Sequence, residues 1–249
     1  MIDLNNKVTL ITGGSRGIGK ACVKLFAEAN SKVAFTYKST KGQAEKLEKE
    51  FPENVKSYKT DMESENEIVE TVTQVVNDFG KIDVLVHNAG IWNDGALEKM
   101  NLENWNEMIR INLTSTFIFC KAVAPFMKQN NFGRIILVSS TAGQIGEAFH
   151  SHYAASKGGM ISFTKSLAVE LADSNITVNS VAPGWVDTEM CNSVFADKEY
   201  KESVRKGIPV GRIATAEDIA GPILFLASEF ARHINGEILN VNGGSVLCG

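Results

Sequence analysis

Short apolar runs alternate along the whole chain with longer stretches in which apolar residues recur at helical spacing. The short runs hold four or five residues and are rich in β-branched side chains, which is typical of buried strands. We predict strands at Val8–Thr12, Lys32–Thr36, Val55–Lys59, Val84–His87, Arg134–Val138, Thr177–Val181 and Glu237–Val241. We predict helices between them at Ile18–Ala29, Gln43–Glu50, Glu65–Phe79, Leu102–Met127, Tyr153–Leu171 and Ala216–Ala227.

This strict alternation of strands and helices determines the fold class. Consecutive strands joined by helices need crossover connections, and these produce a parallel sheet with helices on both faces. No linker, low-complexity tract or repeat divides the chain. We therefore predict a single doubly wound, Rossmann-type α/β domain over residues 1–249, with a seven-stranded parallel sheet. Ligands of such sheets bind beyond the carboxyl ends of the strands.

Composition and charge narrow the function classes. The 249 residues are 44% hydrophobic and 22% charged, as in ordinary globular proteins, which excludes a disordered or fibrous chain. The 25 Lys and Arg against 29 Asp and Glu give a net charge of −4, which argues against nucleic acid as the main partner. The sequence shows no signal peptide and no membrane-spanning apolar run, and its four cysteines lack metal-type or disulfide-type spacing. We expect a cytoplasmic protein with no membrane segment and no bound metal.

The first predicted strand runs directly into a glycine-rich turn, Thr12–Gly19 (TGGSRGIG), that opens the first helix. Glycines at 13, 17 and 19 permit a tight turn and let a pyrophosphate approach backbone N–H groups at the positive end of the helix. The spacing differs from the G-x-G-x-x-G fingerprint, so the turn alone is weak evidence for a dinucleotide.

The same turn also matches G-x-S-x-G, the nucleophile elbow of serine hydrolases, with Ser15 at the centre. Too few residues precede Gly13 to supply the earlier strand and loop of a hydrolase oxyanion hole. The last histidine, His233, comes before the final strand rather than after it. These two facts disfavour a hydrolase.

Tyr153 and Lys157 stand four residues apart near the start of a predicted helix, which places both side chains on one face. A free phenol has a pKa of about 10 and is a poor acid or base at neutral pH, and a neighbouring ammonium group lowers that pKa. The pair is therefore suited to protonate a developing alkoxide or to deprotonate an alcohol.

A second pair, Tyr37 and Lys41, has the same spacing, so the spacing alone does not identify the chemical pair. Ser140 stands 13 residues before Tyr153 and just after a predicted strand, where its hydroxyl can project into a cleft. The corresponding residue before Tyr37 is Lys24, inside the first predicted helix. This context favours the pair at 153 and 157.

With these motifs in place, the chain resembles the short-chain dehydrogenase/reductases from end to end. The motifs that carry the resemblance are Thr12–Gly19, His87–Gly90 (HNAG), Asn112, Ser139–Ser140, Tyr153 with Lys157, Pro183–Gly184 and Asn242–Gly244 (NGG). Within the family the chain is most similar to the 3-oxoacyl-acyl-carrier-protein reductases, through Asn112–Thr114, Phe163–Leu167 and Val178–Gly184. The resemblance implies NADPH-dependent reduction of a 3-oxoacyl thioester to a secondary alcohol by hydride transfer, in fatty acid biosynthesis.

The resemblance also implies catalytic roles. Tyr153 would be the acid/base, Lys157 would bind the nicotinamide ribose and tune Tyr153, and Ser140 would bond to the substrate oxygen. Asn112 would hold a water in a proton relay behind Lys157. The chain departs from the family at His87, where an Asn is usual, but that position is more structural than chemical. The other histidines, at 150, 152 and 233, are also interpreted as non-catalytic.

The residues implied to bind the cofactor follow the ends of the predicted strands. They are Gly13, Ser15, Arg16, Gly17, Ile18, Gly19, Tyr37, Lys38, Asp61, Met62, Asn88, Ala89, Gly90, Tyr153, Lys157, Pro183, Gly184, Val186 and Thr188. An NAD site presents an acid at the end of the second strand, whereas matching this chain to the family places Tyr37 there. Lys38 and Arg16 supply two cations that suit a ribose 2′-phosphate, so we predict NADP(H).

The substrate side is implied to lie along Thr141–Ser151 and a lid at about 185–208. Apolar side chains in and near these segments predict a moderately apolar pocket: Trp92, Ile145, Phe149, Trp185, Met190 and Phe195. The family's docking positions for the acidic acyl carrier protein hold few cations here, with Lys128 followed by Gln129–Asn131, and later Asp173–Asn175. An NADP-dependent carbonyl reductase or alcohol dehydrogenase acting on a free small molecule therefore stays an alternative.

A non-catalytic dinucleotide sensor is disfavoured because Ser140, Tyr153 and Lys157 are all present. The catalytic helix also carries small residues that permit close approach of a second helix: Ala154, Ala155, Ser156, Gly158, Gly159 and Ser162. The resemblance implies a two-fold interface between copies of this helix and of Leu102–Met127, so we expect a homotetramer.

Overall fold

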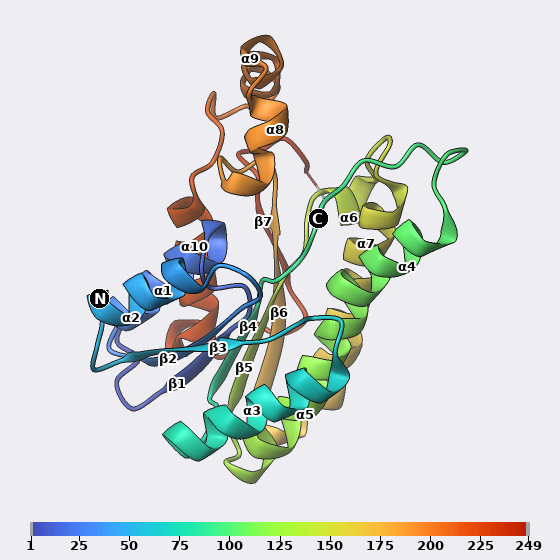
Figure 1. The fold of residues 1–249 in the computed structure, drawn as a ribbon. Helices are drawn as coiled ribbons and strands as arrows, with labels where there is room; N and C mark the ends of the chain where they lie inside the picture. The colour runs from blue at the N-terminus through green and yellow to red at the C-terminus, as the bar shows by residue number, and fades with distance from the viewer. Residues whose placement is uncertain (1, 248–249) are drawn as a thin grey trace.

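The predicted strands form one parallel sheet in the computed structural model, which describes residues 2–247 (Figure 1). The strands are β1 (Val8–Ile11), β2 (Lys32–Tyr37), β3 (Val55–Lys59), β4 (Val84–His87), β5 (Gly133–Val138), β6 (Ile176–Pro183) and β7 (Ile238–Val241). All seven pair in parallel, in the order β3-β2-β1-β4-β5-β6-β7, so the predicted α/β fold is confirmed. Met1, Cys248 and Gly249 lie outside the described residues; Cys248 is one of the four cysteines counted above.

The direction of winding reverses at β1. This strand pairs with β2 on one side, with Val8 opposite Lys32, and with β4 on the other, with Thr9 opposite Val84. The loops that follow β1 and β4 therefore leave the sheet in opposite directions. In sheets of this order, the crevice between such loops binds ligands.

Helices cover both faces of the sheet (Figure 1). They are α1 (Gly17–Glu28), α2 (Lys41–Glu50), α3 (Glu65–Phe79), α4 (Leu102–Ile109), α5 (Ser115–Gln129), α6 (Ala142–Ile145), α7 (Ser151–Glu170), α8 (Asn192–Phe195), α9 (Lys198–Lys206) and α10 (Ala216–Ala227). One apolar core joins α1, α2 and α10 to strand residues such as Ile11; the other joins α3, α5 and α7 to residues such as Leu10. Since adjacent strand residues point to opposite faces, both must be apolar, which explains the continuous apolar runs. No helix among residues 2–247 has the length and apolar content needed to cross a membrane.

The helix predicted at Leu102–Met127 is interrupted by a π-helical turn, η1 (Arg110–Thr114), between α4 and α5. Two hydroxyl groups bond to backbone carbonyls at this point: Ser115 Oγ donates to Ile111 O at 2.6 Å and Thr116 Oγ1 donates to Asn112 O at 2.7 Å. Such bonds compete with the regular helical ladder and accompany a widened turn. The prediction of one regular helix is wrong here, because side-chain periodicity does not reveal one wide turn.

The segment 185–208 contains a short 3₁₀ turn, η3 (Glu189–Cys191), and the helices α8 and α9, none of which the apolar pattern predicts. Helix α9 is polar and is capped by Asp197, whose side chain accepts hydrogen bonds from the N–H groups of Glu199 and Tyr200 at 2.9 and 3.1 Å. In Figure 1, α8 and α9 rise beyond the carboxyl end of the sheet, and α6 and α7 stand to one side of them.

Candidate active site

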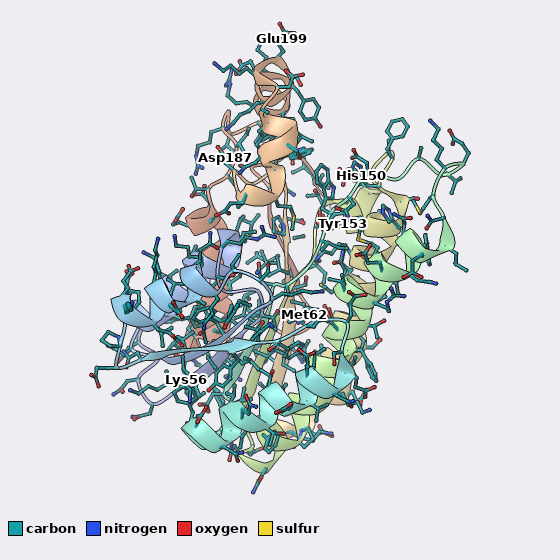
Figure 2. All side chains as sticks on the ribbon, viewed as in Figure 1. Lys56, Met62, His150, Tyr153, Asp187 and Glu199 are labelled. Carbon is teal, nitrogen blue, oxygen red and sulfur yellow. The ribbon has the colours of Figure 1, made fainter. Side chains whose placement is uncertain are left out.

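Tyr153, Lys157 and Ser140 meet where β5 ends and α7 begins. Tyr153 and Lys157 lie in the first two turns of α7, and Ser140 lies just beyond the end of β5. A side-chain hydrogen bond joins Ser140 to Tyr153, and Lys157 Nζ lies 5.8 Å from the centre of the Tyr153 ring. Figure 2 shows Tyr153 on the α7 side of the molecule and Asp187 on the side of the segment 185–208. The structure thus brings together the three side chains that the sequence groups.

Lys157 is buried, with only 3% of its surface exposed. Its Nζ donates a 2.8 Å hydrogen bond to the carbonyl of Val138, the last residue of β5. A Cβ placed on Gly90 would lie 3.6 Å from Nζ, so the loop after β4 also approaches the ammonium group closely. Burial lowers the pKa of Lys157 to about 8, because desolvation disfavours the charged form.

The pKa of Tyr153 is raised to about 12. Desolvation is the main cause, and the hydrogen bond from Ser140 works in the opposite direction. The sequence predicts that Lys157 lowers the pKa of Tyr153. The pKa is raised instead, because the phenol is removed from water and Lys157 Nζ is bonded to the carbonyl of Val138. A phenol with a raised pKa is fully protonated at neutral pH, which is the form that can donate a proton to a carbonyl oxygen.

Asn112 lies in the π turn and ties the loop after β4 to α7. Its amide accepts from Ile91 N–H at 2.8 Å and donates to Ile91 O at 3.0 Å and to Ser156 Oγ at 3.2 Å. A Cβ on Gly90 would lie 3.1 Å from Asn112 Oδ1. The side chain of Asn112 therefore positions this loop beside Lys157.

The glycine-rich turn adopts the conformation that its glycines permit. The φ angle is +66° at Gly13 and +52° at Gly17, in the left-handed region that favours glycine. A Cβ on Gly19 would lie 2.1 Å from Gly13 O, so no larger residue fits there. Helix α1 starts at Gly17 with no side-chain cap and no acid in its first turn, so its positive end remains available to an anion. The turn therefore fits a pyrophosphate group.

Two threonines without a predicted role hold this turn in place. Thr12 Oγ1 accepts hydrogen bonds from the N–H groups of Asn88 and Ala89 at 3.0 and 2.9 Å, and Thr36 Oγ1 accepts from Gly13 N–H at 3.1 Å. Asn88 Nδ2 in turn donates to Thr12 O at 3.1 Å. The signal that could have identified both is a hydroxyl at the carboxyl end of an otherwise apolar strand.

Lys38 and Asp61, both implied to face the adenosine, bond to one another. Lys38 Nζ lies 2.8 Å from Asp61 Oδ2 and 3.5 Å from Glu63 Oε2, and the hydrogen bond to Asp61 is the main cause of a raised pKa for Lys38. Lys38 follows Tyr37 at the end of β2, and Asp61 follows β3, with the side chain of Met62 buried beside it. The cation nearest Tyr37 is thus shared between two carboxylates.

The residues implied to hold the nicotinamide follow β6. Pro183 ends the strand, and Gly184 N–H donates to Val241 O at 3.2 Å. Val186 is buried, and Thr188 reaches the glycine-rich turn, where its Cβ lies 3.4 Å from the position of a Cβ on Gly17. Together with the groups after β1, β4 and β5, these residues lie at the carboxyl edge of the sheet.

Comparison with known proteins supports this arrangement. A family model described as Enoyl-(Acyl carrier protein) reductase matches residues 13–245. The chain is 40% identical over 246 residues to the 3-oxoacyl-[acyl-carrier-protein] reductase FabG of Vibrio cholerae, a match that covers 99% of this chain and 100% of the relative. It is 39% identical to the FabG of Escherichia coli K12, with the same coverage. The chain belongs to the short-chain dehydrogenase/reductase family.

A solved structure, the crystal structure of gox2181, confirms the fold of this short-chain dehydrogenase/reductase. Its TM-score is 0.94 at 31% identity, and the match covers 98% of this chain and 97% of that chain. The protein is therefore an oxidoreductase by family. The hydrolase interpretation is wrong, because the family is a different enzyme class and Ser15 Oγ is bonded to Thr40 Oγ1 at 2.7 Å, a hydroxyl that cannot act as a general base.

Aromatic rings form a wall between the loop after β4 and the segment 185–208 of this short-chain dehydrogenase/reductase. Trp92 stacks on His150 with ring centres 4.4 Å apart, and Trp185 meets Trp92 edge-on at 5.8 Å. Trp185 also contacts Phe195 of α8 and Tyr200 of α9, at 5.5 and 6.1 Å. The remaining predicted pocket residues lie outside this wall, because Ile145, Phe149 and Met190 are 66%, 70% and 42% exposed.

The histidines have structural contacts. His87 is buried between Thr12 Oγ1 at 3.2 Å and Ser115 Oγ at 3.3 Å, and burial, aided by the Lys157 charge, lowers the pKa of His87 to about 3. The ring of His150 lies between Asp94, 2.9 Å from Nε2, and Glu147, 3.5 Å from Nδ1. Neither ring bonds to Tyr153 in the described structure.

Proposed function

We propose that this protein catalyses the NADPH-dependent reduction of a 3-oxoacyl thioester, carried on acyl carrier protein, to a 3-hydroxyacyl thioester in fatty acid synthesis. The observation that carries the proposal is the hydrogen-bonded Ser140 and Tyr153 beside the buried Lys157 at the carboxyl edge. Relatives that are named 3-oxoacyl-[acyl-carrier-protein] reductase and match this chain over their full length support the substrate class.

The carboxyl edge provides a continuous binding surface for a dinucleotide. The uncapped start of α1 with Gly13, Ser15, Gly17 and Ile18 suits the pyrophosphate, and the segment Asn88–Gly90 suits the adenosine side. The segment from Pro183 to Thr188 suits the nicotinamide amide. When bound, the reduced nicotinamide supplies a hydride for the carbonyl carbon.

Each side chain at this edge has a separate role in the reduction. Ser140 donates a hydrogen bond to the carbonyl oxygen and fixes it beside the phenol. Tyr153, protonated because its pKa is raised to about 12, donates a proton to that oxygen as negative charge develops there. Lys157 binds the ribose hydroxyls, and Asn112 holds the adjoining loop and a water that replenishes the proton through Lys157.

The cofactor preference for NADP(H) rests on Tyr37, Lys38 and Arg16. Tyr37 offers no carboxylate to a ribose 2′-hydroxyl, and Arg16 is exposed at the start of α1, from which a guanidinium can reach a 2′-phosphate. Lys38 is bonded to Asp61, so a 2′-phosphate competes with that carboxylate for the same ammonium group. The preference for NADPH over NADH is therefore expected to depend more on Arg16 than on Lys38.

The assembly that we propose is a cytoplasmic homotetramer. The small residues of α7 are only partly available for it, because Gly159 packs on Leu113 and Ser156 bonds to Asn112. Exposed apolar side chains on α4, α5 and α7 support a subunit interface more directly: Leu102, Trp105, Phe117 and Val169. Light scattering at micromolar concentration is expected to give four times the mass of one chain, and a monomer would contradict the assembly.

Steady-state NADPH oxidation with matched substrates tests the function. We expect the highest kcat/KM with 3-oxobutanoyl-acyl carrier protein, a lower value with the same acyl group on coenzyme A, and little turnover of simple ketones. The carrier-bound and free thioesters share the reacting group, so their ratio isolates the contribution of carrier docking. Faster turnover of free ketones than of either thioester would refute the proposal.

One observation favours a second candidate, an NADP-dependent carbonyl reductase or alcohol dehydrogenase acting on a free small molecule. The positions implied to meet the acidic carrier offer one cation, Lys128, while Asp173 beside them is exposed and of the same sign as the carrier. Equal kcat/KM for the carrier-bound and the free thioester would support this candidate.

A further inference from the structure

A cavity of about 660 Å³ lies at the opposite edge of the sheet from Tyr153. Its lining residues are Lys7, Phe132, Arg134, Asn175, Glu229, Arg232 and His233. Because the strands are parallel, the residues before or at the start of β1, β5 and β6 all lie at the amino edge. In Figure 1 the loop from α5 to β5 is at the bottom of the view, whereas α8 and α9 are at the top. An occupant of this cavity is therefore neither the substrate nor the cofactor of the carboxyl edge.

The lining of this amino-edge cavity is cationic in an acidic protein. It holds three full cations, Lys7, Arg134 and Arg232, against the single carboxylate of Glu229, whereas the whole chain has a net charge of −4. The Glu229 side chain is 65% exposed and lies 3.5 Å from Arg134 Nη2. The nearby carboxylate of Asp83 is already bonded to Val8 N–H at 2.8 Å and to Lys81 Nζ at 2.9 Å. The cations of the cavity thus lack a dedicated buried counter-charge.

Arg134 has an unpartnered donor although it is 1% exposed. Its Nη1 donates to Gly133 O at 2.9 Å and to Asn175 O at 3.3 Å, and its Nη2 makes only a long bond of 3.5 Å to the exposed Glu229 carboxylate, which leaves Nε without a hydrogen-bond partner among residues 2–247. Buried polar groups are nearly always satisfied, and a buried guanidinium is usually paired with a carboxylate or phosphate. The free donor of a buried side chain that lines the cavity points to an acceptor that the chain itself does not supply.

Phe132 holds two of the cations close to one another. Lys7 Nζ lies 3.4 Å from the centre of its ring and Arg134 Cζ lies 4.4 Å from the same centre, so the two charges cannot be farther apart than the sum of these distances. Burial lowers the pKa of Lys7 and of Arg134, which shows that the loss of water outweighs the attraction of the surrounding carboxylates. An anion in the cavity that reaches both cations would relieve both costs.

We propose that the amino-edge cavity binds a small oxyanion, through the free Nε–H of the Arg134 guanidinium, the Lys7 ammonium group and the exposed Arg232. The ligand class is a compact molecule with a carboxylate or phosphate group, because guanidinium and ammonium donors form their strongest hydrogen bonds with these acceptors. The site is independent of the reduction that we propose for the carboxyl edge.

Calorimetric titration of the NADPH-saturated protein tests this site, since the bound dinucleotide then fills the other anion-binding surface. Inorganic phosphate and malonate are the two probes, in chloride buffer of constant ionic strength. We expect saturable binding of at least one probe with a Kd of about 1 mM or below. Phosphate alone would assign the site to phosphate compounds, malonate alone to carboxylates, and both to oxyanions in general.

Two variants at the cavity and two controls decide whether the binding occurs there. Lys7→Met and Arg232→Gln each should weaken binding at least about fivefold, because each removes one charged donor without disturbing the buried Arg134. Lys165→Met, which removes an exposed cation on α7, should leave the Kd unchanged. Tyr153→Phe should also bind the probe normally, so loss of the proposed reaction and loss of this site are separable. No saturable binding, or equal weakening by Lys165→Met, would overturn the proposal.

Discussion

The chain contains two Tyr-x3-Lys pairs, and they lie in opposite environments. Tyr153 and Lys157 share one helix, and Lys157 is 3% exposed with its Nζ bonded to the Val138 carbonyl. Tyr37 ends β2 and Lys41 begins α2, where the Lys41 side chain is 75% exposed and lies 3.7 Å from Glu45. Equal spacing in sequence therefore produces one buried chemical pair and one ordinary surface cation.

The difference shows what the i, i+4 relation requires. Two residues at this spacing face the same side only when one helix contains both, and a strand-to-helix boundary between them separates their directions. Burial then changes the pKa of the lysine. The pKa of Lys157 falls to about 8 because water is excluded around it. The predictions below change residues of the buried pair and residues at or next to the exposed one.

Tyr153→Phe should have the largest effect. Removing the phenolic proton donor is expected to lower kcat by roughly 10²–10⁴-fold, with NADPH binding nearly unchanged, since the proton is needed only as the carbonyl oxygen gains charge. Stopped-flow and steady-state NADPH oxidation measure this, and fluorescence titration measures the cofactor affinity. Tyr37→Phe is the matched control and should retain most turnover. The opposite result would mean that the wrong pair has been assigned.

Lys157→Met should lose activity and gain stability. At neutral pH the folded protein carries the cost of a buried ammonium group, since the pKa of Lys157 is lowered to about 8. Removing the buried charge stabilises the folded state, and the lost hydrogen bond to Val138 O offsets part of this gain. We therefore expect the free energy of unfolding to rise by about 1–3 kcal/mol at pH 7. Urea unfolding measures this change. Lys41→Met should alter it by less than about 0.5 kcal/mol, because that side chain is exposed.

The same burial predicts a pH dependence of stability. Below about pH 8 Lys157 is protonated in both states, and the folded state pays the full cost of its charge. Between about pH 8 and the usual pKa of 10.5, the unfolded chain binds one more proton than the folded chain, so this residue makes stability increase with pH. The difference in unfolding free energy between the native protein and Lys157→Met should therefore shrink over this window. A constant difference from pH 7 to pH 10 would show that Lys157 is not desolvated.

The smallest effect is expected next to Tyr37. Lys38→Ala should lower kcat/KM for NADPH relative to NADH by about three- to tenfold, because the ammonium group is more than half exposed and shared with Asp61. Tyr37→Asp should shift the preference further toward NADH by repelling a 2′-phosphate. If the native enzyme already prefers NADH, the proposal of NADP(H) as the cofactor is wrong. The proposed binding of a 2′-phosphate at the end of β2 would then be wrong as well.

The sequence was sufficient for the sheet and for the residues at its strand ends. Val84–His87 and Val55–Lys59 have the predicted bounds, because short β-branched runs between helices leave few alternatives. Ser140, Tyr153 and Lys157 could be grouped because each lies at a predictable distance from β5 or in one helix.

Other features depend on contacts between distant segments and left no local signal. The ion pair of Lys38 with Asp61 joins the ends of two strands, and the bonds of Asn112 to Ile91 join the π turn to the loop after β4. Helix α9 was missed because it is short and polar, so that its cap at Asp197, rather than an apolar face, defines it. The direction of the Tyr153 pKa shift likewise depends on burial, which spacing does not report.

The π turn between α4 and α5 holds one more residue than a regular helical turn. Its hydrogen bonds span five residues instead of four, so deleting one residue within Arg110–Thr114 would allow a regular α-helical turn with α4 and α5 in nearly the same orientation. The buried Met108 would stay in the core, but the amide of Asn112 would lose the widened turn from which it faces both Ile91 and Ser156. The length of this turn is therefore as constrained as the identity of any side chain in the site: a single-residue deletion would release the loop beside Lys157 while leaving the sheet and both flanking helices in place.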